Sequence, residues 1–269
     1  MLPMWPMFFD IKHLRKNWFL VLFSTIFVFG GLLILWAGSL KIPDLTSFEE
    51  RRVLNSTKIY DRTEKVLLYD VHQNIKRTAI SGEEMGNYIK NATVAVEDKD
   101  FYKHGGVRFA SIVRAVLVNS LTGSFSQGGS TITQQVIKNA LLTQDKKISR
   151  KLKEWVLATK LEQVMNKDDI LALYLNEAPY GGDVYGISEA SNRYFSKKPK
   201  ELNLVEAAYL AALPQAPTYY SPYGKNKLKL DERKNVVLGR MKELKIITDT
   251  QYQNAKNEQV TFVPNTSNS

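Results

Sequence analysis

One segment of this chain, from Asn17 to Leu40, contains 24 consecutive residues without an ionisable side chain. The hydrocarbon core of a lipid bilayer is about 30 Å thick, and roughly 20 apolar residues in a helix cross it. Trp18 and Trp36 lie near the two ends of the segment, and tryptophan favours the interfaces of a membrane. We therefore expect a transmembrane helix over residues 17–40.

The flanks of this segment indicate its orientation. Lys12, Arg15 and Lys16 stand in the preceding tail, residues 1–16, and positive charge marks the cytoplasmic side of a membrane. The sequence Ala37-Gly38-Ser39 is compatible with cleavage of a signal peptide, but the apolar stretch is long for one, which favours retention. We expect a single-pass protein of the cell membrane whose remaining residues lie on the extracytoplasmic side.

The composition restricts the chemistry. There are 37 Lys and Arg residues against 27 Asp and Glu, and this net charge of +10 favours an anionic partner: nucleic acid, a membrane surface or a phosphorylated substrate. An extracytoplasmic position argues against nucleic acid. The absence of cysteine excludes disulfides, thiolate metal sites and a cysteine nucleophile. Because there are only three histidines, a His-rich zinc site is not expected, and we assign no residue to a metal.

The rest of the chain divides into a stalk and one helical domain. Residues 57–71 alternate apolar and polar side chains around a polar turn, which predicts a short β-hairpin within a stalk of residues 41–82. From residue 83 to 257 apolar residues recur at helical spacing, over enough chain to bury a core. The polar residues 258–269 are interpreted as a tail or the start of a linker. The expected fold class is mainly α.

The first cluster that could carry chemistry is EDKDFYKHGG, residues 97–106. Glu97 and Asp98 are adjacent carboxylates at the end of an apolar helical run. Two such groups can occupy different environments, one of them suited to a general base. A solvated helix end accounts for the same pattern, and His104 by itself is typical of a hydrogen-bonded structural residue.

The second cluster is SQGGSTITQQVIKN, residues 126–139. Two glycines precede Ser130 and Thr131, either of which could cap a helix. Gln135 and Lys138 are three residues apart and share a face of that helix. Such a helix start can hold an oxyanion, although an ordinary capped helix explains the pattern equally well. The residue order is not that of a P-loop, so nucleotide binding is not supported.

The third cluster is KKISRKLKEWVLATKLEQ, residues 146–163. Arg150 and Lys151 lie four and three residues before Glu154, so the three side chains project from one side of a helix. Charge runs usually mark a solvated face, but a glutamate among cations also fits a site that grips phosphate groups. The apolar stripe expected to face the core consists of Leu152, Trp155 and Val156.

Two further stretches follow. Residues 167–182, KDDILALYLNEAPYGG, predict a helix that breaks at a Pro-Tyr-Gly-Gly turn. Residues 204–222, LVEAAYLAALPQAPTYYSP, predict an alanine-rich helix that packs closely against its neighbours and ends at proline.

In order and spacing, these five stretches resemble the peptidoglycan glycosyltransferase domain of class A penicillin-binding proteins and monofunctional transglycosylases. The family patterns are EDxxFxxHxG, GxSTITQQxxKN, RKxxExxxAxxxE, KxxILxxYLNxxxxG and EAAxLAxLPxAPxxYSP. All five occur in this sequence, and the resemblance covers about residues 57–257. Their first residues here are Glu97, Gly128, Arg150, Lys167 and Glu206.

This resemblance implies a lysozyme-like helical domain with a smaller jaw that faces the membrane. It implies that the protein polymerises Lipid II, a disaccharide-peptide on undecaprenyl diphosphate, into β-1,4-linked glycan with inversion and release of undecaprenyl diphosphate. The implied partners are Lipid II, the growing glycan strand, the lipid bilayer and other proteins of cell-wall synthesis. No cofactor is required, although a divalent cation such as Mg²⁺ stimulates some members of the family.

The resemblance also assigns roles to residues. Glu97 matches the general base that takes the proton from the 4-hydroxyl of the acceptor sugar, and Glu154 matches the second essential carboxylate. The residues that match the group around the donor diphosphate are Lys138, Arg150 and Lys153. The residues that match the lining of the cleft are Ser130, Gln135, Arg114 and Asn176, and Asp98 is counted with this substrate-binding set.

The apolar segment 107–121 is expected to be the jaw that touches lipid, with Arg108 and Arg114 near head groups, although a core helix is the alternative. The sequence departs from the family at Ser196, where the YFGK pattern has glycine. It contains no SxxK, SxN or KTG motif of a serine transpeptidase. We expect a monofunctional polymerase or the N-terminal part of a bifunctional protein, and the extended VTFVP near the end favours the second.

Two other functions fit part of the pattern. A glycoside hydrolase could use Glu97 and Glu154 as an acid–base pair, but it has no need of cations placed for a diphosphate. A non-catalytic membrane scaffold could bind anionic lipid through the basic residues, and its role would not depend on Glu97.

Overall fold

The computed structural model describes residues 18–41, 57–60, 62, 67–71, 78–108, 129–141 and 147–264, and the chain divides into two units after Lys41. The first unit contains helix α2, Trp18–Ser39, which is long and apolar enough to cross a membrane by length and composition. The hydroxyl groups of Ser24 and Thr25 both donate to the carbonyl oxygen of Val21. These bonds keep the two polar side chains compatible with an apolar surrounding.

The second unit begins with the predicted hairpin. Strand β1, Thr57–Tyr60, pairs antiparallel with β2, Leu67–Val71, so that Thr57 lies opposite Val71 and Ile59 opposite Tyr69. The hairpin expected over residues 57–71 is therefore confirmed.

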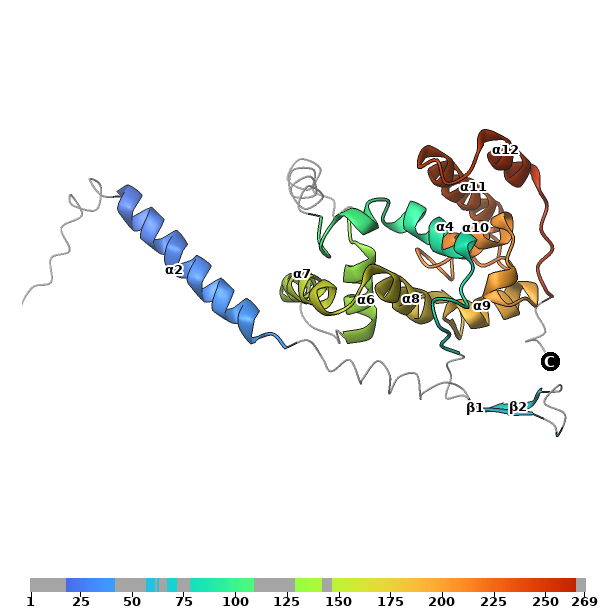
Figure 1. Cartoon of the computed structure of the whole chain (residues 1–269), viewed down its shortest axis with the longest axis horizontal. Coiled ribbons are helices and arrows are strands. Elements are labelled where there is room, and N and C mark those ends of the chain that lie inside the picture. The colour runs from blue at the N-terminus through green and yellow to red at the C-terminus, as the bar shows by residue number, and fades with distance from the viewer. Residues whose placement is uncertain are drawn as a thin grey trace, which may run out of the picture. The chain divides into compact units, whose positions relative to one another are not determined.

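The remaining elements of the second unit are mainly helices, as expected (Figure 1). In chain order they are α4 (Asn87–Glu97), η1 (Phe101–Lys103), α6 (Ile132–Leu141), α7 (Lys147–Val164), α8 (Lys167–Glu177), β3 (Pro179–Gly181), β4 (Val184–Tyr185), α9 (Ile187–Phe195), η2 (Pro199–Glu201), α10 (Leu204–Ala212), α11 (Lys227–Glu243) and α12 (Asp249–Asn257).

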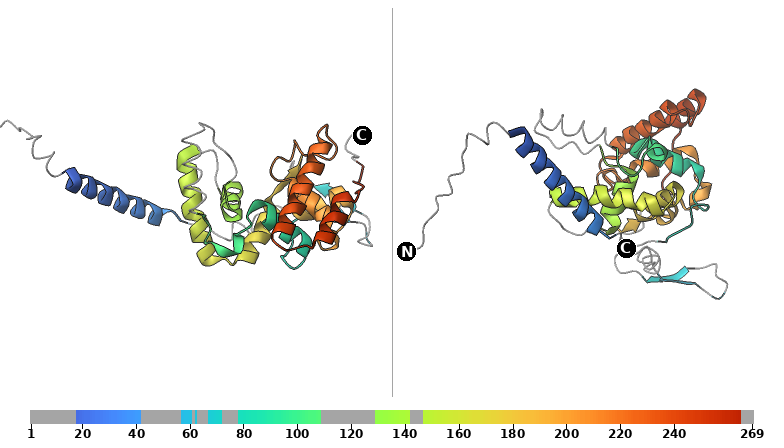
Figure 2. Two further views of the ribbon diagram at one scale, coloured as in Figure 1. Left: turned by 90° about the horizontal axis from the view of Figure 1, so that it is seen from above. Right: turned by 60° about the vertical axis from the view of Figure 1, so that its left-hand side comes forward.

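These helices pack in two groups. In the first group α4, α10 and α11 contact one another and α12 packs on α11, while in the second group α6 contacts both α7 and α8. Helix α9 touches α8 and α10 and so connects the groups. The views in Figure 2 place α7 at the end of the domain opposite α11 and α12. The carboxyl end of α4 therefore reaches from the first group towards α6 in the second.

Helix α10 forms the centre of the first group. Every residue from Val205 to Ala212 is buried, and four of these eight residues are alanine. Small side chains allow neighbouring helices to approach closely on several sides. The close packing predicted for the alanine-rich stretch is confirmed.

The structure differs from the sequence prediction in two places. The residues after α8 form the small antiparallel pair β3–β4, where only a turn was expected. The chain after α12 also stays packed on the domain, because the amide of Val263 donates to the carbonyl of Tyr194 at 2.9 Å and the Phe262 ring stacks on Phe195. Phe262 and Val263 therefore pack against α9 through an aromatic ring and a backbone hydrogen bond.

Helix α9 ends at a residue that carries backbone strain. Ser196 has φ 52° and ψ 38°, in the left-handed region, and its side chain is exposed. This is the position at which the family pattern has glycine. A residue with a Cβ atom costs roughly 1–2 kcal/mol in this conformation.

We expect Ser196→Gly to raise the free energy of unfolding by about 0.5–1 kcal/mol, because the relief of left-handed strain exceeds the extra backbone entropy that glycine loses on folding. Urea denaturation of the detergent-solubilised chain measures the change. Ser188→Gly is the matched control: Ser188 lies within the same helix, where glycine is unfavourable, and stability should fall by about 0.5 kcal/mol. Equal effects of the two substitutions would contradict the strain assigned to Ser196.

Candidate active site

Glu97 is the last residue of α4, and its side chain is partly exposed. The Nε2 group of Gln135, on the first turns of α6, donates a hydrogen bond of 2.8 Å to one oxygen of the Glu97 carboxylate. The sequence predicted both residues for the site, and the structure brings them into direct contact. Glu97 is therefore a carboxylate that a neighbouring helix orients while solvent can still reach it.

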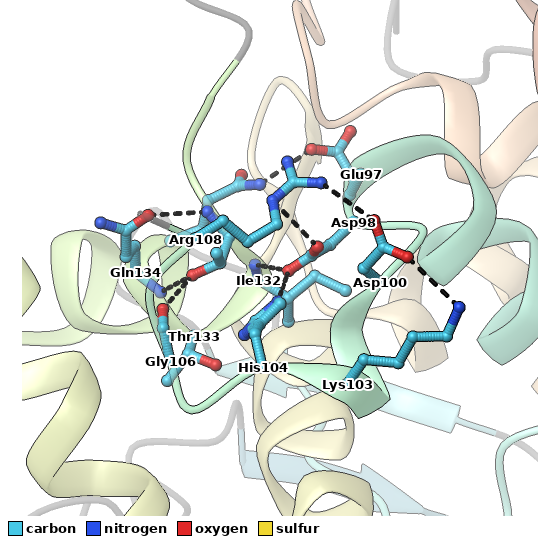
Figure 3. Close-up of polar contacts among 12 residues, drawn as sticks. Glu97, Asp98, Asp100, Lys103, His104, Gly106, Arg108, Ile132, Thr133 and Gln134 are labelled. Atoms are coloured by element: carbon cyan, nitrogen blue, oxygen red, sulfur yellow. Dashed lines mark hydrogen bonds and ion pairs between the residues drawn. The ribbon is translucent and has the colours of Figure 1, made fainter. Parts of the chain in front are cut away.

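Asp98 follows Glu97 but occupies a different environment (Figure 3). Its side chain is fully buried, and its Oδ2 atom accepts from the backbone amide of Ile132 at 3.2 Å and lies 2.8 Å from Nε2 of His104. Nε of Arg108 lies 3.6 Å from the other carboxylate oxygen. The expectation that adjacent carboxylates occupy unlike environments thus holds in the structure.

These contacts correct the place given to Asp98 among the substrate-binding residues. A side chain with no solvent exposure, surrounded by His104, Arg108 and the start of α6, cannot touch a substrate in this conformation. The sequence analysis counted Asp98 with the binding residues on the resemblance to the family, and a motif does not reveal burial.

The amino end of α6 is closed by a reciprocal capping box. The Thr131 hydroxyl accepts from the amide of Gln134 at 3.1 Å, and the Gln134 side chain accepts from the amide of Thr131 at 2.8 Å. Such a pair satisfies backbone amides that a helix start leaves free. Of the two caps considered from the sequence, Thr131 caps the helix, which leaves the Ser130 hydroxyl available for another contact.

The loop that follows Asp98 is pinned to three helices. The Thr131 hydroxyl donates to the carbonyl of Gly106 at 2.5 Å, and Nζ of Lys167, on α8, donates to the carbonyl of His104 at 2.5 Å. Gly106 has φ 86°, and a Cβ atom there would lie 2.6 Å from the carbonyl oxygen of Ala158 on α7. No other residue type fits at this contact without a shift of the backbone.

Glu154 lies on α7 and is almost completely buried. Its carboxylate accepts from Nζ of Lys151 at 2.7 Å and lies 3.6 Å from Nε of Arg150. The same Lys151 ammonium donates to the Ser130 hydroxyl at 2.7 Å. Lys151 therefore connects the second carboxylate to the start of α6.

The buried face of α7 is not the one predicted. Leu152 is exposed and Trp155 and Val156 are only partly buried. The residues that face the core are Glu154, Leu157, Ala158 and Leu161. The predicted stripe was wrong because Glu154, with its carboxylate paired to cations, turns inward and rotates the buried face away from Leu152.

Two sets of contacts therefore meet at the segment Ser130–Gln135. Glu97 reaches it through Gln135, and Glu154 reaches it through Lys151 and Ser130. The carboxylates come from α4 and α7, which lie in different helix groups, and α6 is the element common to both. A partly exposed acid and an acid paired with cations are thus tied to the two ends of one short segment.

The other predicted site residues have different positions. Lys138 is exposed on α6, three residues after Gln135, and Lys153 is partly exposed on α7. Arg114 and most of the expected jaw, 107–121, lie outside the described residues, as does the chain from 109 to 128.

Asn176 binds the backbone of a segment that precedes α4. It is largely buried on α8, where its side chain accepts from the amide of Ile80 at 3.1 Å and donates to the carbonyl of the same residue at 2.9 Å. Both of its polar groups are used to bind the extended segment before α4. Asn176 thus satisfies both backbone groups of Ile80, and its expected place in the lining of a cleft stays a prediction.

Two tyrosines near Glu97 were missed by the sequence analysis. Tyr174 and Tyr180 are buried, and burial, followed by the negative charge of Glu97, raises the pKa of both phenols well above the ordinary value. They therefore stay neutral at physiological pH. Their distance along the chain from Glu97 gave no signal of this proximity.

Comparison with known proteins identifies the family. A model described as Transglycosylase matches residues 64–242. Penicillin-binding protein 1A of Aquifex aeolicus (strain VF5) is 40% identical over 242 residues, which cover 90% of this chain and 33% of that protein. Penicillin-binding protein 1F of Bacillus subtilis (strain 168) is 40% identical over 230 residues, which cover 83% and 30%.

Among solved structures, penicillin-binding protein 1A from Haemophilus influenzae is 24% identical, with a TM-score of 0.45 and coverage of 78% of this chain and 21% of that one. The chain spans about a third of the length of the two relatives named above. The match to the family model covers most of the helical domain and includes every carboxylate and cation of the site described here. The chain belongs to the transglycosylase family.

Proposed function

We propose that this chain is a membrane-anchored peptidoglycan glycosyltransferase that polymerises Lipid II into β-1,4-linked glycan, with inversion and release of undecaprenyl diphosphate. The convergence of Glu97 and the cation-paired Glu154 on Ser130–Gln135 is the observation that carries the proposal. Family membership supports it. The activity belongs either to a monofunctional enzyme or to one part of a bifunctional penicillin-binding protein.

Glu97 is proposed as the general base. The 4-hydroxyl of the acceptor sugar gives its proton to the Glu97 carboxylate while its oxygen forms the new bond to the anomeric carbon of the donor. A general base must be accessible, and its carboxylate must point towards the hydroxyl that it deprotonates. The hydrogen bond from Gln135 fixes the orientation of the Glu97 carboxylate. The buried and neutral Tyr174 and Tyr180 compete with it neither as acids nor as bases at physiological pH.

The cations around Glu154 are proposed to hold the diphosphate. As the bond from the anomeric carbon to the diphosphate oxygen breaks, its electron pair leaves with the phosphate, and fixed positive charge stabilises that developing charge. Arg150 and Lys151 are held by Glu154 on one side of α7, and Lys138 and Lys153 add charge on α6 and α7. Because Glu154 is buried, its role is to hold these cations.

The proposal also covers the membrane anchor, the metal and the partners. A helix such as α2, retained as an anchor with the domain outside the cytoplasm, would confine enzyme and lipid-linked substrate to one surface, which raises their effective concentration. No metal is assigned a step, since protein cations serve the diphosphate, and Mg²⁺ would act only as an added counter-ion. The proposed partners are Lipid II, the growing strand, the bilayer and other cell-wall synthesis proteins.

A glycoside hydrolase is the second candidate, because Glu97 and Glu154 are two acids tied to one segment. The pairing of Glu154 with Lys151 and Arg150 favours the transferase, since a hydrolase releases no diphosphate. Incubation of the purified chain with Lipid II should yield lengthening glycan, and the phosphoglycolipid moenomycin should block it. Release of fragments from finished glycan, without new polymer, would favour the hydrolase.

We expect Glu97→Gln to lower the polymerisation rate by about 10²–10⁴-fold, because the amide keeps the shape of the side chain but cannot take up the proton. The assay follows chain growth from labelled Lipid II. Glu83→Gln, at an exposed glutamate before α4, is the matched control and should keep wild-type activity. Activity that survives Glu97→Gln would support a non-catalytic scaffold instead.

We expect Lys138→Ala to impair use of the lipid-linked donor more than binding of the acceptor, because the lost ammonium group is assigned to the donor diphosphate. Initial rates measured while one substrate is varied at a fixed level of the other separate the two effects. Lys200→Ala removes one exposed positive charge from η2 and should change neither. Equal loss towards donor and acceptor would refute the assignment of Lys138.

A further inference from the structure

The buried carboxylate of Asp98 has no role in the reaction proposed above, although it adjoins the base. It lies under Glu97 in a setting with three positive or donating partners: His104, Arg108 and the backbone amide of Ile132 (Figure 3). Burial of an ionised carboxylate is unfavourable unless such partners replace water. Removal of this carboxylate alone would leave the Ile132 amide and the Arg108 guanidinium without their acceptor, so the contacts of Asp98 act together.

One of these bonds joins the two helices that carry Glu97 and Gln135. Asp98 adjoins Glu97 at the end of α4, and Ile132 lies three residues, nearly one turn, before Gln135 on α6. The contact from Asp98 to the Ile132 amide therefore runs beside the contact from Glu97 to Gln135. Two adjacent bonds between the same two elements fix their separation and rotation in a way that one bond cannot.

His104 fixes the Asp98 carboxylate in turn. A carboxylate only accepts, so the His104 ring donates from Nε2 to Oδ2, the same atom that accepts from Ile132. The backbone of His104 is itself held by the Lys167 ammonium group on α8. The direction of the Asp98 side chain is thus set by a residue whose own position is determined by a third helix.

We propose that Asp98, oriented by His104, is a positioning residue that holds the Glu97–Gln135 pair in the geometry needed for proton transfer. This inference rests on the proposed function, because it assigns to Glu97 the part of the base. Asp98 and His104 touch neither substrate. Their loss allows the end of α4 to move relative to α6, so the base is misdirected while the donor and acceptor sites keep their residues.

Substitutions of His104 test the proposal through kcat and KM for Lipid II. His104→Ala removes the donor and should lower kcat at least about tenfold, with KM changed less than about twofold, because a small displacement of a reacting group is costly. His104→Gln keeps an N–H donor near the place of Nε2 and should recover most of kcat. Asp98→Ala should match His104→Ala or exceed it.

Asn203→Ala is the control for simple destabilisation. Asn203 caps α10 through a reciprocal box with Glu206, and none of the hydrogen bonds of this box involves Asp98, His104 or α6. Its loss should lower the melting temperature, as that of His104 does, but leave kcat unchanged. If kcat falls in Asn203→Ala as far as in His104→Ala, or if His104→Gln is no better than His104→Ala, the positioning role is overturned.

A double-mutant cycle with Gln135→Ala examines the route by which Asp98 acts. If His104 and Asp98 work through the Glu97–Gln135 pair, the losses of kcat in His104→Ala and Gln135→Ala should be strongly non-additive. Independent, multiplying losses would refute this route.

Hydrogen exchange separates failure of this inference from failure of the proposed function. An inactive wild-type chain would refute the polymerase proposal. The exchange rate of the Ile132 amide would then still test whether His104 and Asp98 fix the start of α6. Faster exchange in His104→Ala, with rescue in His104→Gln, supports the fixed contact between Asp98 and α6. Unchanged exchange in His104→Ala refutes it, whatever the activity.

Discussion

The satisfied amino end of α6 is the constraint on which the site depends. A helix start leaves several amides without partners, and here Thr131, Gln134 and Asp98 supply acceptors for three of them. The same short segment also makes two side-chain contacts: Gln135 donates to Glu97, and Ser130 accepts from Lys151. One capped helix start therefore determines where an accessible acid from α4 and a cation-bound acid from α7 stand. If this helix end moved, the positions of Glu97 and Glu154 relative to each other would no longer be fixed.

Paired charge is the second theme of the structure. Asp98, Glu154 and Glu162 are all largely withdrawn from water, and each has a cation or histidine within reach. Such pairs add little net stability by themselves, because desolvation offsets attraction. They fix the positions of the charged groups, because the ammonium groups of Lys151 and Lys167 each donate to a carboxylate and to a second acceptor. For a reaction in which a diphosphate departs, cations held in fixed positions are more effective than mobile ones.

Sequence patterns predicted most of the architecture and part of the site. The long apolar helix, the hairpin, the helical domain and a cap at Ser130 or Thr131 follow from periodicity and capping chemistry, which are local properties. Burial of polar groups is what these patterns did not indicate. Glu154 and Asp98 face the interior, and Asn176 binds the backbone of Ile80, because partners far away in sequence compensate their polarity. A pattern that sorts residues by polarity places such side chains on the surface.

The sequence alone determined that this chain contains one segment fit to span a membrane, a mainly helical domain without cysteine chemistry, and a set of acids and cations in the order of a known family. Only the tertiary structure decided that Lys151 bonds Glu154, that Gln135 bonds Glu97 and that the Asp98 side chain is buried. The physical reason is that helix formation depends on neighbours along the chain. The environment of a charged group depends instead on which helices meet around it, and packing of α4, α6 and α7 sets that.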